Sequence, residues 1–85
     1  MKALVVGYGS IGQRHARVLE ELGFEVAVVS RRPVEHPRRY DCLDTALSGW
    51  RPEYVVIASR TSEHFDDLGA LVAAGFAGRV LVEKP

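Results

Sequence analysis

Three glycines near the N-terminus, in the pattern Gly7-x-Gly9-x-x-Gly12, have the spacing of a turn that can hold a phosphate group. An apolar run at residues 2–6 precedes them and a segment with helical periodicity follows. In that context the first glycine permits a tight turn, the second leaves the backbone open to a pyrophosphate, and the third lets the helix pack closely on the strand. The N–H groups and the positive dipole end at the helix start would face the phosphates. The alternative is that these glycines serve only a tight turn. The residues expected to contact a dinucleotide here are Gly7, Tyr8, Gly9, Ser10, Ile11 and Gly12.

The end of the second apolar run carries the residues that would choose between two dinucleotides. About 20 positions after the glycines, an acidic residue would accept hydrogen bonds from the adenosine ribose hydroxyls of NAD. The chain has Ser30, Arg31 and Arg32 there instead, with Arg38 and Arg39 farther along. A hydroxyl beside guanidinium groups suits the 2′-phosphate of NADP, since arginine binds phosphate through a bidentate fork. We therefore expect NADP(H) to be preferred over NAD(H), the alternative being a solvated arginine-rich loop.

The periodicity of the chain alternates between strands and helices. This alternation predicts an α/β fold, a doubly wound parallel sheet of the Rossmann type with strand order 3-2-1-4-5. Pro33 and Pro37 interrupt the segment before Tyr40, so the third strand is expected to be short. The predicted strands cover residues 2–6, 24–29, 40–42, 54–58 and 79–82, and the predicted helices cover residues 10–22, 43–50 and 61–74.

Apolar spacing within the helices predicts which residues face the sheet. In the first helix this face comprises Ile11, His15, Val18, Leu19 and Leu22. In the last helix, which Thr61 or Ser62 is expected to cap, it comprises Phe65, Leu68, Leu71 and Val72. Cys42 is expected to be a small buried residue, and Trp50 to pack against the core or its edge.

Composition limits the classes of protein to consider. The chain has 85 residues, a formal net charge of zero and 47% hydrophobic residues, as in ordinary soluble domains. Nothing in that balance favours nucleic acid or a membrane surface as a partner. The single cysteine excludes an internal disulfide, no Cys/His cluster has metal-ligand spacing, and the apolar start is too short for a membrane span. We expect one domain over residues 1–85, in the cytoplasm, with no metal.

Three stretches together resemble a known family. Residues 5–15, Val-Val-Gly-Tyr-Gly-Ser-Ile-Gly-Gln-Arg-His, resemble the opening of the Gfo/Idh/MocA oxidoreductases, the glucose-fructose oxidoreductase and inositol dehydrogenase group. Residues 55–59, followed by Thr61 and His64, are similar to that family's next strand and turn. Residues 79–85, Arg-Val-Leu-Val-Glu-Lys-Pro, are similar to its most specific marker, a strand that ends in Glu-Lys-Pro.

The resemblance implies roles for residues that spacing alone leaves unassigned. Lys84 would lie beside the nicotinamide as the catalytic residue and stabilise the alkoxide that develops on a substrate alcohol. Glu83 would orient the site. Ser59, Thr61 and His64 would lie near the cofactor, with a solvent-facing His64 as the alternative.

The resemblance also implies that part of the enzyme is lacking. The family has a further Rossmann strand and a second α/β domain that supplies most of the substrate pocket, so the Rossmann domain is expected to be incomplete at its C-terminal end. We expect an NAD(P)-dependent oxidoreductase acting on a sugar or polyol-like alcohol, the 85-residue chain alone being inactive. A nucleotide-binding regulatory module and a non-functional truncated product are the alternatives. The unpaired edge of the last strand, at residues 79–82, could also promote self-association.

Overall fold

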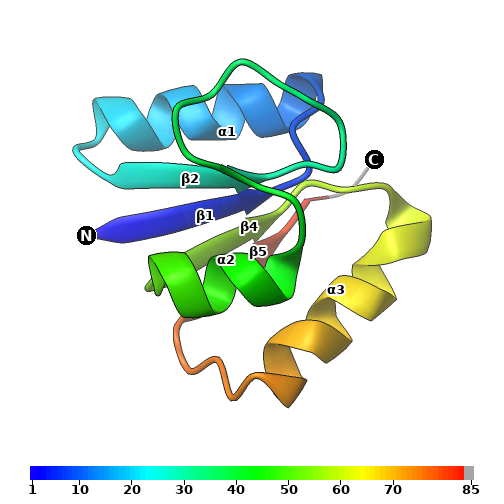
Figure 1. The fold of residues 1–85 in the computed structure, drawn as a ribbon. Helices are drawn as coiled ribbons and strands as arrows, with labels where there is room; N and C mark the ends of the chain where they lie inside the picture. Colours follow the sequence, from blue (N-terminus) through cyan, green and yellow to red (C-terminus); the bar gives the residue numbers. More distant parts are fainter. Residues whose placement is uncertain (84–85) are drawn as a thin grey trace.

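Apolar, β-branched segments form a parallel sheet at the centre of the molecule (Figure 1). A computed structural model describes residues 1–83, in which five strands pair in the order β3-β2-β1-β4-β5, every pair parallel. The predicted Rossmann order is therefore confirmed. The strands are β1 (Lys2–Val6), β2 (Glu25–Val29), β3 (Arg39–Tyr40), β4 (Tyr54–Ile57) and β5 (Arg79–Val82).

Three helices cover the two faces of this sheet unequally. Helix α1 (Ser10–Glu21) lies on one face, and α2 (Leu43–Trp50) and α3 (Thr61–Ala73) lie on the other (Figure 1). Successive side chains of a strand point to opposite faces, so β1 contributes to both cores. Leu4 and Val6 belong to the cluster under α2 and α3, whereas Ala3 and Val5 belong to the cluster under α1. This double coverage explains why β1 is a continuous apolar run.

The buried face of α1 differs from the predicted one. Ile11, Val18 and Leu22 are 39%, 46% and 69% exposed, while the buried positions are Gly12, Ala16 and Leu19. The tight turn after β1 brings the start of the helix so close to the strand that only small side chains fit between them. His15 was expected to share the sheet-facing side, but it is only partly buried.

The apolar stripe predicted for α3 is also wrong in most positions. Only Leu71 is buried, at 3% exposure, whereas Phe65 and Val72 are 86% and 80% exposed and Leu68 is 37% exposed. Neither Thr61 nor Ser62 is the cap: the N-cap residue is Arg60, whose carbonyl accepts the amide of Glu63 at 2.8 Å. Periodicity identified the apolar stripe, but no element within residues 1–83 covers it.

The remaining elements differ from the expectation by few residues. The third strand is limited to Arg39–Tyr40, and α2 has its predicted bounds. Trp50 is partly buried against the core and donates from Nε1 to the carbonyl of Ala3 at 2.8 Å.

Cys42, expected to be buried, is exposed at the start of α2. No helix among residues 1–83 has the length and apolarity that crossing a bilayer requires.

Candidate functional site

A cleft of about 620 Å³ opens along the carboxyl ends of the strands. The glycine turn lies between the part of the cleft formed after β2 and the part formed after β4. On the β2 side, the amide of Gly7 donates to the carbonyl oxygen of Val29 at the end of β2 (2.9 Å). On the other side, the amide of Ala58 at the end of β4 donates to Val6 (2.8 Å). The strand order reverses between β1 and β4, and open α/β sheets bind ligands at such a point. The cleft therefore has the position expected of a dinucleotide site.

The three glycines of the turn have different surroundings. Gly7 has φ +91°, and a Cβ there would lie 2.7 Å from the backbone of Ser59. A Cβ on Gly12 would lie 1.9 Å from the carbonyl oxygen of Gly7, so the helix can approach the turn only without a side chain. Gly9 lines the cleft, and a Cβ on it would meet nothing within 4 Å. The space beside Gly9 is thus open to a ligand, as a phosphate cradle requires.

The start of α1 presents hydrogen-bond donors to this space. Gly9 is the N-cap residue, and within residues 1–83 no side chain caps the helix there. The first N–H groups of a helix have no partner inside the helix, and they carry the positive end of its dipole. Together with the open face of Gly9, they form a site suited to an anion.

The segment after β2 contributes one hydroxyl-bearing and two guanidinium-bearing residues to the cleft. Ser30, Arg31 and Arg32 all line it. Ser30 Oγ donates to the carbonyl oxygen of Arg32 at 2.9 Å, which folds the segment back on itself. Arg39 does not line the cleft as a free charge: its Nη1 donates to Asp41 Oδ1 at 2.6 Å and to the Ser30 carbonyl at 2.8 Å.

Arg38 has a separate role. Its guanidinium carbon lies 5.0 Å from the centre of the Trp50 ring, which also has Lys2 Nζ at 4.8 Å. Arg38 keeps its charge beside the Trp50 ring and Arg39 is paired with Asp41, and neither is among the residues that line the cleft.

Sequence reasoning missed the acidic part of the cleft. Carboxylates from the segment after β3 and from α2 and α3 line it, namely Asp41, Asp44, Glu63, Asp66 and Asp67. Applying the strand-end rule to the short β3 would have identified the first two. The ion pair with Arg39 neutralises Asp41, so the nearest free cations to the Ser30 hydroxyl along the chain are Arg31 and Arg32.

Cys42 also lines this cleft. Its Sγ lies 3.0 Å from the hydroxyl oxygen of Thr45, one turn into α2. The hydrogen bond from the Thr45 side chain stabilises the thiolate and lowers the pKa of Cys42. The cleft thus holds an exposed thiol that sequence reasoning placed in the core.

The turn after β4 is held by its own polar groups. Ser59 lines the cleft, and its Oγ donates to Asp67 Oδ2 at 2.5 Å. His64 Nε2 lies 2.7 Å from the carbonyl oxygen of Ser59 and donates to it, so the ring closes the turn at the start of α3. This contact favours a structural role for His64, whose ring is not among the groups that line the cleft.

A comparison with protein-family models identifies the chain. A model of the Gfo/Idh/MocA family, described as an oxidoreductase family with an NAD-binding Rossmann fold, matches residues 1–85. The chain belongs to the Gfo/Idh/MocA family. A search among curated proteins finds no match. The family assignment, together with the fold, makes this an NAD-binding Rossmann domain whose ligand is a nicotinamide dinucleotide.

The Glu-Lys-Pro segment that led to the Gfo/Idh/MocA resemblance is described only as far as Glu83. The amide of Glu83 donates to Ile57 O at 2.9 Å, which extends the pairing of β5 with β4 by one residue. Its Oε2 lies 2.7 Å from His15 Nε2. Lys84, the predicted catalytic residue, lies outside the described residues.

The predicted Gfo/Idh/MocA site residues separate into two groups. Those that line the cleft are Gly7, Tyr8, Gly9, Ser30, Arg31, Arg32 and Ser59. Ser10 and Ile11 begin α1, and Gly12 packs behind the turn. Glu83 directly follows β5, and the structure describes Thr61 only as the first residue of α3. Among residues 1–83 there is no group of three or more potential metal ligands.

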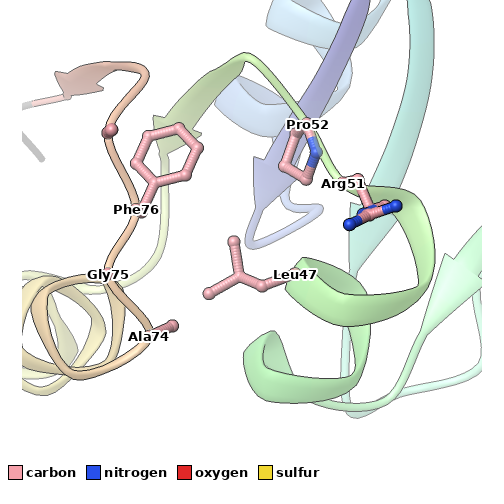
Figure 2. A pocket seen from close by; sticks show the side chains of 7 residues that line it. Leu47, Arg51, Pro52, Ala74, Gly75 and Phe76 are labelled. Carbon is pink, nitrogen blue, oxygen red and sulfur yellow. The ribbon is translucent and has the colours of Figure 1, made fainter.

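A second hollow, of about 340 Å³, lies at the other end of the strands from this cleft. Figure 2 shows Leu47, Pro52 and Phe76 around it, with Arg51 nearby. Its walls come from the loops that lead into β4 and β5, so it opens at the amino ends of the strands. The glycine turn lines the cleft at the carboxyl ends and is not part of this second hollow.

Proposed function

We propose that this chain binds NADP(H) as the cofactor-binding part of an oxidoreductase that transfers hydride to or from a sugar or polyol-like alcohol. The observation that carries the proposal is the open face of Gly9 at the uncapped start of α1, in the cleft that also contains Ser30, Arg31 and Arg32. The phosphates would bind at the helix start, and the adenosine ribose would bind beside Ser30.

The preference for NADP(H) rests on charge. A 2′-phosphate beside Ser30 would meet the guanidinium groups of Arg31 and Arg32, which are exposed and have no side-chain partner among the contacts within residues 1–83. The nearby carboxylate of Asp41 is already paired with Arg39. Charge-assisted hydrogen bonds from arginine to a phosphate are among the stronger polar contacts in proteins.

The chemical step is assigned to Lys84 through the family's Glu-Lys-Pro segment. When bound, the nicotinamide ring supplies the hydride acceptor or donor. The ammonium group of Lys84 would stabilise the developing alkoxide of the substrate alcohol. This part of the proposal rests on the sequence resemblance and on family membership.

Fluorescence titration with NADPH and NADH tests the cofactor preference. Arg31→Asp should weaken NADPH binding by roughly 10- to 100-fold, because it replaces an attraction to the 2′-phosphate with a repulsion. The affinity for NADH should change little. Arg17→Asp is the matched control, because Arg17 is exposed on α1 and does not line the cleft. Equal or tighter binding of NADH by the unaltered chain would overturn the preference, and failure to bind either dinucleotide would overturn the proposed function.

A further inference from the structure

One polar contact joins α1 to the end of β5, across 68 residues of sequence. His15 Nε2 lies 2.7 Å from Glu83 Oε2, and the side chains are only 25% and 35% exposed. An ionised carboxylate only accepts hydrogen bonds, so the imidazole nitrogen donates. Glu83 is therefore held twice, through its side chain by His15 and through its amide by the carbonyl of Ile57.

The position of Glu83 relates this contact to one half of the cofactor. A dinucleotide spans a Rossmann sheet, with one mononucleotide on each side of the point where the strand order reverses. Ser30, at the end of β2, marks the adenosine side. The nicotinamide half would then extend over β4 toward β5, and Glu83 is the first residue after that strand.

We propose that His15 is a positioning residue for the nicotinamide half of the site, and that it acts through Glu83. This inference rests on the proposed function. The same helix carries the phosphate turn at its first residue and His15 about one and a half turns later. Helix α1 thus connects the group that holds the pyrophosphate to the end of β5, and the peptide bond after Glu83 leads directly to Lys84.

The packing of α1 gives His15 no other evident task. The helix is attached to the sheet by Gly12, Ala16 and Leu19, which are buried, whereas His15 is only partly buried. Within residues 1–83, the His15 side chain forms its hydrogen bond with Glu83. Removing the imidazole should therefore release the end of β5 without removing the contacts that hold the helix.

Binding of a whole cofactor and of its adenosine half separates this role from a general effect on folding. The ligands are NADPH and adenosine 2′,5′-bisphosphate, and the variants are His15→Leu, Glu83→Gln and the double variant. His15→Leu should weaken NADPH binding by roughly three- to tenfold. The effect is no larger because solvent partly screens the His15–Glu83 contact. Binding of the bisphosphate should stay within about twofold, because the adenosine side is unaltered.

Two further variants identify the cause. His15→Gln retains an N–H donor and should restore most of the NADPH affinity. The double variant should bind NADPH no more weakly than whichever single variant, His15→Leu or Glu83→Gln, binds it less tightly. Glu25→Gln removes the same charge from an exposed position at the opposite end of the sheet and should change nothing. Amide exchange at Glu83, measured without ligand, should accelerate in His15→Leu, while exchange at Gly7 should not.

The outcomes distinguish the inference from the function on which it rests. Equal losses for both ligands, or a His15→Gln variant as weak as His15→Leu, would overturn the positioning role and leave the proposed function intact. Failure of the unaltered chain to bind either ligand would overturn the proposed function and the positioning role together.

Discussion

Replacing Gly12 with alanine should separate α1 from the glycine turn. The added Cβ would lie 1.9 Å from the carbonyl oxygen of Gly7 and 3.0 Å from its carbonyl carbon. Both neighbours are backbone atoms, so no side chain can rotate to make room. The helix start must move by about 1.5 Å to restore an ordinary contact of 3.4 Å. The neighbouring buried residue Ala16 would lose part of its contact with the sheet in consequence.

The expected cost is large for a domain of this size. Overpacking a close contact costs about 1–3 kcal/mol, and a clash between backbone atoms belongs at the upper end of that range. The total free energy of unfolding expected for 85 residues is about 4–13 kcal/mol. In a domain this small, each kcal/mol lowers the midpoint of thermal unfolding by about 4–8 °C. Gly12→Ala should therefore unfold about 12–24 °C below the unaltered chain when followed by circular dichroism.

Gly9→Ala is the matched control, with the opposite expectation. Its backbone has φ −78°, which alanine adopts freely, and a Cβ there meets nothing within 4 Å. The midpoint of unfolding should fall by less than about 5 °C, the small loss arising because alanine is a poorer N-cap than glycine. The methyl group would occupy the space assigned to a phosphate, so NADPH binding should weaken by roughly tenfold or more. A Gly12→Ala variant as stable as the unaltered chain would refute the close approach, and a Gly9→Ala variant with full affinity would refute the phosphate site.

Two further outcomes are expected. Thr45→Val should slow alkylation of Cys42 by iodoacetamide near pH 8, because loss of the hydroxyl hydrogen bond raises the pKa of the thiol and reduces the thiolate fraction. Equal alkylation rates in the two folded proteins would contradict this. In denaturant the variant and the unaltered chain should react at the same rate. The chain should also self-associate at high concentration through β5, because no strand within residues 1–83 pairs with its outer edge and Val80, Leu81 and Val82 are about 40% exposed. Leu81→Lys should weaken the association. Sedimentation that shows a monomer at all concentrations would rule this out.

The sequence alone determined the architecture and the position of the phosphate turn. Continuous apolar runs alternating with helical segments can form few structures besides a parallel sheet with helices on its faces. At positions 7 and 12 of the turn the backbone leaves no room for any side chain, and at position 9 the open space suits a phosphate. The spacing of the three glycines therefore identified the turn before its geometry was known. Local chemistry of this kind depends on neighbours in sequence and is readable there.

Only the tertiary structure decided which apolar side chains are covered and which charges are free. Periodicity shows that Phe65 and Val72 share a stripe of α3, but whether another element covers that stripe depends on packing over long distances. Arg39 pairs with Asp41 only two residues away, but the partner of Glu83 lies on another segment, and Glu83 meets His15 only because β5 ends near α1. A hydrogen bond across 68 residues leaves no periodic signal, because its two ends are brought together by the order of the strands.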